Sequence, residues 1–268
     1  MHTRLGITGR LLAVTVTAGL ALGVAGCGDE GHSGPGYASK DSTVKADHST
    51  ALTKDNLVPT SYQASTKAGS AHMTMTMTGR ASMRAHGDVS YAGGNPTMQM
   101  TLALAKLGAG KSLQMRYVGK ILYMQIPGLT PAGKYLAIDP SDPSSPLAKS
   151  FAGLSGQMDP VGAMKSLQGA IKSVDRVGKG SIGGTPVDHY RVVVDTAKVL
   201  KAQKQKVPAG IPATLTYDMW LDQQHLLRRM TFAISGTSFE MLMSKWGEPV
   251  KVQRPAAGDV VKAPTPTA

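Results

Sequence analysis

The chain has 268 residues and a formal net charge of +12, which is enough for one large domain or two small ones. Aromatic residues make up only 5%, whereas methionine reaches 15 residues. An ordinary core prefers Leu, Ile, Val and Phe because their rotamers are well defined, so heavy use of Met favours an interior that adapts to its contents. A core that merely tolerates Met is the alternative. The scattered Lys and Arg, with no stacking aromatics among them, argue against a nucleic-acid partner, and a single Cys excludes an intramolecular disulfide.

Residues 1–26 have the features of a targeting segment. Two arginines precede the apolar run 11–22, which is too short for a comfortable membrane span. The following Val24-Ala25-Gly26-Cys27 resembles a bacterial lipobox, and this resemblance implies that Cys27 carries a diacylglyceryl anchor as the mature N-terminus. An ordinary secretory signal with a chance cysteine is the alternative.

An anchor of two or three acyl chains, such as palmitate, holds a protein stably, so we expect it on the outer face of the cell membrane. Removal of residues 1–26 deletes two arginines and no acid, which lowers the net charge from +12 to +10. A basic chain in this place favours anionic headgroups or wall polymers, and a merely solvated basic surface is the alternative.

Composition divides the rest of the chain into three ranges. Residues 27–45 are rich in Gly, Ser, Asp and Lys and are predicted to form a lipid-anchored flexible tether. Residues 46–255 show no internal boundary and are predicted to form one domain. Residues 256–268 consist mainly of Ala, Pro, Thr and Lys and are predicted to form a disordered tail.

The first strand of that domain is predicted over residues 71–78, where Met and Thr alternate strictly. Alternation sends Met73, Met75 and Met77 to one face of the strand and the threonines between them to the other. Further strands are predicted over 85–91, 97–105, 112–118, 120–126, 134–139, 174–182, 187–195, 214–221, 226–235 and 237–243. Turns are expected at 93–96, at Gly119 alone, at 222–225 and at Ser235-Gly236. Consecutive strands without helices between them favour an antiparallel meander in an α+β fold.

Few helices are predicted. Residues 52–67 have a helical pattern in which Pro59 implies either two pieces or one helix that begins near Val58. Asp159-Pro160 is a helix start, and it is followed at helical spacing by Val161, Met164, Leu167 (or Gln168) and Ile171. This second helix is either a core helix or a lid over the Met-rich sheet. The basic run 198–206 is predicted to be a solvated helix or loop.

Methionine on the strands has two interpretations. Three thioethers beside His72 would suit a soft metal such as Cu(I). Alternatively, flexible side chains would line an apolar cavity. Met recurs on at least six predicted strands, always in the apolar register, and this distribution favours a lining. The predicted pocket lining is Met73, Met75, Met77, Met98, Met100, Leu102, Leu113, Met115, Met164, Leu167, Met219, Leu221, Met230, Phe232, Met241 and Met243.

No catalytic motif is apparent. The sequence lacks a Gly-x-Ser-x-Gly elbow, a phosphate-cradling Gly-rich loop and a His-Glu-x-x-His helix. Asp188 and His189 are adjacent, but on a strand they point to opposite faces, which favours a structural histidine. His72, His86 and His225 share no metal-site spacing. We therefore predict no enzyme activity, no metal site and no cofactor other than a bound lipid.

Several short motifs occur in a characteristic order between about residues 50 and 255. They are the segments 119–128 (GKILYMQIPG), 133–139 (GKYLAID), 159–160 (DP), 187–192 (VDHYRV), 220–222 (WLD), 226–229 (LLRR) and 246–250 (WGEPV). With a lipobox ahead of them, the chain resembles the actinobacterial LppX/LprG family of lipoproteins, which share the LolA-like fold. Tyr135 stands where the family often has Trp, a mild departure that leaves the strand prediction intact.

The resemblance implies a curved antiparallel half-barrel with helices covering its concave face. Family members hold the acyl chains of membrane lipids or glycolipids there and carry them across the envelope, and no short motif marks their pocket. We expect a monomer, with a membrane lipid exporter as a candidate partner. The alternatives are a non-catalytic envelope sensor or interaction module with a filled core, and a Met-rich copper-binding protein. A cavity above about 1,000 Å³ between sheet and helices would favour the carrier, because ordinary ligand pockets span about 300–1,000 Å³.

Overall fold

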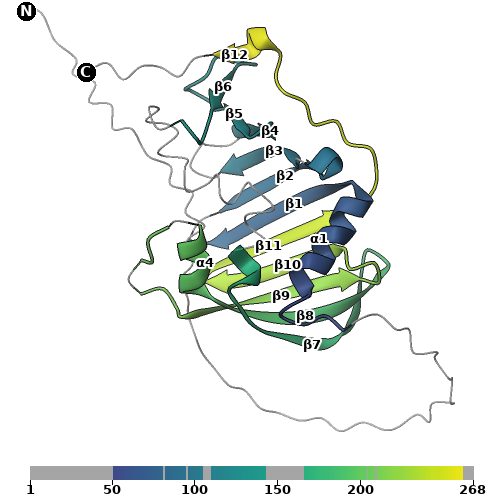
Figure 1. The fold of residues 1–268 in the computed structure, drawn as a ribbon. Coiled ribbons are helices and arrows are strands. Elements are labelled where there is room, and N and C mark those ends of the chain that lie inside the picture. Colours follow the sequence, from purple (N-terminus) through teal and green to yellow (C-terminus); the bar gives the residue numbers. More distant parts are fainter. Residues whose placement is uncertain are drawn as a thin grey trace, which may run out of the picture.

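The computed structural model describes residues 51–80, 82–94, 96–104, 110–142, 166–203, 205–208 and 210–261. The predicted signal segment, Cys27 and the tether lie outside these ranges. All described strands belong to one 12-stranded sheet in the order β12-β6-β5-β4-β3-β2-β1-β11-β10-β9-β8-β7 (Figure 1). The strands are β1 (Ser70–Gly79), β2 (Met83–Ser90), β3 (Thr97–Leu104), β4 (Ser112–Val118), β5 (Ile121–Gln125), β6 (Tyr135–Ile138), β7 (Ile171–Ile182), β8 (Thr185–Asp195), β9 (Thr214–Asp222), β10 (Leu227–Ile234), β11 (Thr237–Ser244) and β12 (Val260–Val261).

The sheet is curved and open, with β12 and β7 at its two edges (Figure 1). Neighbouring strands are antiparallel throughout, except that β12 pairs with β6 in parallel. The helices α1 (Leu57–Ala68) and α4 (Thr196–Ala202) lie on one side of it. The predicted α+β class, a half-barrel with helices over one face, is therefore confirmed. No helix in the described residues is long and apolar enough to cross a membrane.

Two-residue turns set the register of two hairpins. Between β4 and β5, Gly119 and Lys120 have φ of 61° and 65°, and Val118 pairs with Ile121. The prediction of a one-residue turn at Gly119 was wrong, because a tight hairpin needs two central residues and Lys120 supplies the second. Ser235 and Gly236, with φ of 47° and 70°, form the predicted turn between β10 and β11.

α1 is a single helix that begins at Leu57, so the second of the two interpretations of residues 52–67 is the right one. Pro59 falls in the first turn, where backbone N–H groups have no intrahelical acceptor and a proline removes nothing. The helix ends at Gly69, whose φ of 84° places it in the left-handed region. Leu57 and Val58 are buried against the sheet.

The second predicted helix lies mostly outside the described residues, and its described part is helical only at 166–168. Ile171, predicted on that helix, is instead the first residue of β7 and pairs with Val194. Helical spacing alone could not exclude a β-branched residue that packs beside Val192 and Val194 in the sheet. In the basic run, α4 begins at Thr196, and Asp195 caps it by accepting from the Lys198 N–H at 3.0 Å.

The C-terminal segment is ordered further than predicted. Residues 257–261, which fall in the predicted tail, form the 3₁₀ turn η3 (Ala257–Asp259) and strand β12. Val260 and Val261 pair with the otherwise free edge of β6, and Lys134 Nζ donates to Asp259 Oδ1 at 2.9 Å. Two β-branched residues beside an open sheet edge favour pairing, which composition alone does not reveal.

Candidate functional site on the methionine face

One face of the sheet carries a row of methionines that comes from distant parts of the sequence. Met75 on β1 lies opposite Met241 on β11, Met241 lies opposite Met230 on β10, and Met230 lies opposite Met219 on β9. Side chains directly opposite each other in antiparallel strands have Cβ atoms about 4.5–5.5 Å apart. The four thioethers therefore form one continuous row, and we call the face that bears it the methionine face.

A second row crosses the other half of the same face. Met73 lies opposite Gly87, Gly87 opposite Met100, Met100 opposite Met115, and Met115 opposite Met124. Four of these five residues are methionines, and each of the four is at most 9% exposed. Gly87 permits a close approach of β2 to β3, because a Cβ atom there would lie only 1.9 Å from the Gln99 carbonyl oxygen.

Most of the predicted lining residues lie in two buried clusters on this face. One cluster spans β1 to β6 with β11, and the other spans β7 to β10 with α1 and α4. The first contains or contacts Met73, Met75, Met98, Met100, Leu102, Leu113, Met115, Met241 and Met243. The second contains or contacts Leu167, Met219, Leu221, Met230 and Phe232. Met77 belongs to neither cluster and Met164 lies outside the described residues, so the lining as a whole stays a prediction.

The sequence prediction missed Met124 and Leu122, which belong to the first cluster. Their alternation was present in the sequence, but β5 is buried on both sides. Tyr123, between them, is 5% exposed and points to the other face. An uninterrupted apolar run hides the period of two on which the lining prediction relied.

The WGEPV motif closes the end of the methionine face. Trp246 Nε1 donates to the Leu227 carbonyl at 3.1 Å, and its ring stacks on Tyr91 with centroids 6.0 Å apart. The Gly247 N–H donates to the Ser70 carbonyl at 2.9 Å, which ties the segment after β11 to the start of β1. Burial among these groups raises the pKa of Tyr91 to about 12, because the charged phenolate would lose its hydration.

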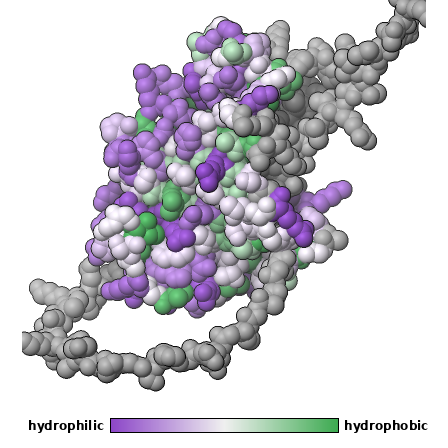
Figure 2. Space-filling view, turned by 180° about the vertical axis from the view of Figure 1, so that it is seen from behind, coloured by the Kyte–Doolittle hydropathy of each residue, from purple (hydrophilic) through white to green (hydrophobic). Residues whose placement is uncertain are grey.

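The opposite face is polar, as the threonine alternation predicts, and hydrophilic residues predominate on it (Figure 2). One of its features is relevant to enzyme chemistry. His189 Nε2 lies 2.8 Å from Asp218 Oδ1 and its ring stacks on Trp220 at 4.4 Å. Asp188 points to the other face of the sheet, in register with Leu221, and pairs with Arg176 on the neighbouring strand. The structural role of His189 stays a prediction. No cluster of His, Cys, Asp or Glu within the described residues could hold a metal ion.

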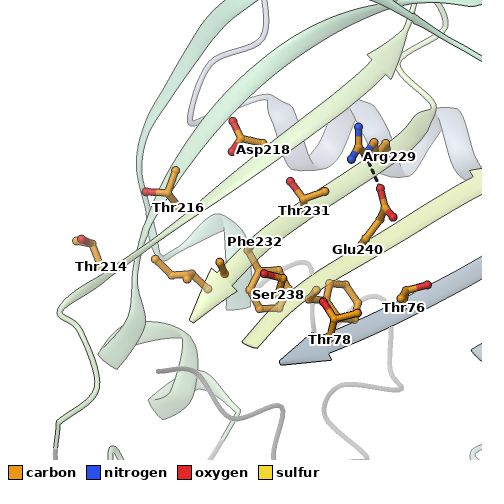
Figure 3. Close-up of a pocket in the computed structure, with 13 residues that line it drawn as sticks. Thr76, Thr78, Thr214, Thr216, Asp218, Arg229, Thr231, Phe232, Ser238 and Glu240 are labelled. Carbon is orange, nitrogen blue, oxygen red and sulfur yellow. Dashed lines mark ion pairs between the residues drawn. The ribbon is translucent and has the colours of Figure 1, made fainter. Parts of the chain in front are cut away.

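A pocket of about 680 Å³ opens on this polar face, over β1, β11, β10 and β9 (Figure 3). We call it the threonine groove, after the six hydroxyl residues that line it. They are Thr76, Thr78, Thr214, Thr216, Thr231 and Ser238. Of the predicted lining residues only Phe232 reaches it, so this groove is distinct from the cavity expected between sheet and helices.

An open, curved sheet with a continuous apolar face beneath helices defines the class, a protein of LolA-like fold. The chain matches the family model of LppX_LprAFG lipoproteins over residues 54–252 and belongs to this family. The predicted resemblance is thereby confirmed. Family membership implies association with a membrane in the cell envelope and is consistent with lipid binding.

The comparison with solved structures supports the fold through one of them. The lipoprotein LppX of Mycobacterium tuberculosis superposes with a TM-score of 0.53 at 17% identity, covering 75% of this chain and 98% of that one. LprF of Mycobacterium bovis gives a TM-score of 0.48 at 17% identity, covering 76% of this chain and 97% of that one. No curated protein sequence matches the chain.

Proposed function

We propose that this lipoprotein binds the acyl tails of lipids or glycolipids against the methionine face and carries them within the cell envelope. The observation that carries the proposal is the pair of cross-strand methionine rows. They make one apolar surface from strands that are far apart in sequence. Methionine suits such a surface because its three rotatable bonds let it adapt to tails of different length and shape.

The energetics of transfer fit a carrier. Burying one methylene is worth about 0.8 kcal/mol, so a 16-carbon tail stranded in water costs roughly 12 kcal/mol. An apolar face beneath helices removes most of this cost. Because the bilayer interior is equally apolar, exchange between membrane and protein is close to thermoneutral. Loading and release then need no external energy source at this step.

The proposal includes the anchor. A lipid on Cys27 would hold the domain at the outer face of the membrane, and a tether over residues 27–45 would reach roughly 20–25 Å. That reach lets the domain turn its methionine face toward the bilayer or away from it. A monomer that receives its lipid from a membrane exporter completes the proposed scheme.

The test is mass spectrometry of the full chain purified from its native host. We expect acyl lipids to co-purify with the wild-type protein. The double variant Met75→Gln, Met241→Gln has side chains of similar shape but places amides in the methionine row. Desolvating such a group costs about 1–3 kcal/mol, so retained lipid should fall about tenfold or more.

The matched control is Thr74→Gln, on the same strand as Met75 but on the polar face, and it should retain lipid as the wild type does. A wild-type protein that is consistently free of lipid would contradict the proposal. Equal loss of lipid in the double variant and the control would show that the methionine face is not the binding surface.

A further inference from the structure

The threonine groove has a regular arrangement of polar groups. Thr76 on β1 lies opposite Glu240 on β11, Glu240 lies opposite Thr231 on β10, and Thr231 lies opposite Asp218 on β9. Hydroxyl and carboxylate therefore alternate across four strands, with Cβ atoms about 4.5–5.5 Å apart. This row is the direct neighbour, one residue along each strand, of the methionine row on the other face.

The charged groups of the groove are held in place by partners on the same face. Asp218 Oδ1 lies 2.8 Å from His189 Nε2, and Arg229 Nε lies 2.7 Å from Glu240 Oε1. The Arg229 guanidinium also lies over the Trp220 ring at 4.8 Å. These contacts fix the carboxylates while leaving other acceptor positions on each of them for a further donor.

The hydroxyl groups of the groove differ from its charged groups in their hydrogen bonding. Among the residues that the structure describes, none of the six hydroxyls of the groove makes a hydrogen bond to another side chain or to the backbone. Each hydroxyl can donate one hydrogen bond and accept two. Figure 3 shows them distributed around the carboxylates of Asp218 and Glu240 rather than gathered at one end.

The charge and size of the groove select the chemistry of a ligand. Each carboxylate of the groove faces an arginine, because Glu240 lies 2.7 Å from Arg229 and Asp218 lies 3.6 Å from Arg191. The charges balance in pairs, so the groove favours a neutral ligand over a strongly charged one. Fixed carboxylates accept strong hydrogen bonds from hydroxyl donors, and threonine hydroxyls both donate and accept. The volume of about 680 Å³ lies within the range of ligand pockets.

We propose that the threonine groove is a second binding site, for a neutral saccharide. A saccharide offers many hydroxyls that act as both donors and acceptors, together with apolar C–H faces, and it carries no charge that the carboxylates would repel. Free oligosaccharide, wall polysaccharide and glycolipid headgroup share this chemistry. The site lies on the face opposite the methionine rows, so it does not depend on lipid binding there.

The test is an array of neutral, acidic and amino oligosaccharides probed with the full chain, followed by calorimetry with the members that bind. We expect neutral oligosaccharides to be retained. Thr231→Val and Thr76→Val should each weaken that binding 3- to 10-fold, because each removes one hydroxyl while keeping a β-branched shape. The matched control Thr74→Val changes the same face of β1 outside the groove and should bind as the wild type does.

Vesicles identify the source of the saccharide. Neutral phospholipid vesicles with and without a glycolipid that carries the retained sugar are compared with the free oligosaccharide. Binding to the free sugar alone assigns the groove to soluble or wall saccharide, and stronger binding to the glycolipid vesicles assigns it to a headgroup. Retention of acidic oligosaccharides only, of no oligosaccharide, or equal binding by Thr231→Val, Thr76→Val and Thr74→Val would overturn the proposal. Lipid co-purification should be unchanged in these variants, so the two proposals fail separately.

Discussion

The two faces of the sheet are built by the same strands yet have opposite chemistry. On β1, β11, β10 and β9 the row Met75, Met241, Met230 and Met219 lies back to back with the row Thr76, Glu240, Thr231 and Asp218. On every strand, the residue of one row is the sequence neighbour of the residue of the other row. Because successive side chains of a strand point to opposite faces, a slip of one residue in any pairing would mix the two surfaces.

The faces also differ in what maintains them. On the methionine face the side chains are held by burial, and Met73 and Met243 are 9% and 5% exposed. On the polar face Thr74 and Thr78 are exposed, and order comes from ion pairs such as that of Arg229 with Glu240. The same substitution should therefore lower the free energy of unfolding far more on the methionine face than on the polar face.

The sharpest test of this difference uses two adjacent residues of β1. Met73→Lys places an ammonium group among buried methionines, and an uncompensated buried charge costs about 3–5 kcal/mol. Thr74→Lys adds the same group to an exposed position and should change the free energy of unfolding by less than about 0.5 kcal/mol. Urea unfolding measures both. Similar costs for the two variants would mean that the faces do not differ in burial as described.

The backbone at the centre of the methionine face gives the next largest effect. In Gly87→Ala the new Cβ would lie 1.9 Å from the Gln99 carbonyl oxygen, so β2 and β3 must separate at a cost of roughly 2–3 kcal/mol. Gly178→Ala on β7 is the matched control, because a Cβ there meets no atom within 4 Å. Thermal unfolding should place Gly178→Ala near the wild type and Gly87→Ala well below it. Equal melting temperatures would contradict the close approach.

The sequence predicted much of this difference, and its limits have physical causes. Strict alternation on β1, β3 and β4 identified the methionine face, because period two is visible wherever one side of a strand is polar. It failed on β5, where Tyr123 is buried too, and at Ile171, whose spacing suited a helix and a strand equally.

Partners across strands could not be predicted from the sequence. Nothing in the local pattern pairs Thr76 with Glu240 or Thr231 with Asp218, because register depends on hairpins and on long-range pairing between β1 and β11. The threonine groove is therefore invisible in the sequence. The pairing of β12 with β6 was missed for the same reason.

A partly buried tyrosine on the methionine face makes the free energy of unfolding depend on pH. Burial raises the pKa of Tyr217 to about 12, above the value of about 10 in an unfolded chain. Between these two pKa values the unfolded chain loses the phenolic proton while the folded chain keeps it. The contribution of Tyr217 to the free energy of unfolding is therefore fully present below pH 10 and is lost as pH rises toward 12. Two pKa units correspond to a loss of at most about 2.7 kcal/mol.

Urea unfolding at intervals from about pH 9 to about pH 11.5 measures how the free energy of unfolding declines with pH. Tyr217→Phe serves as the comparison because it removes the titrating group and keeps the ring. The ring stays tilted against Phe232, with centroids 5.0 Å apart. We expect a shallower decline with pH in the variant. Parallel declines would show that Tyr217 is not protected from water.

The smallest effect is expected on the polar face, where it bears most directly on the threonine groove. Glu240→Gln breaks the ion pair with Arg229. The two side chains are 37% and 40% exposed, so the substitution should lower the free energy of unfolding by only about 0.5 kcal/mol, and by less at high salt. Urea unfolding at low and high salt measures this cost. A cost of several kcal/mol would mean that the ion pair is needed for folding. A small cost would leave the saccharide array to report on binding, because the protein would be folded and only the groove would have changed.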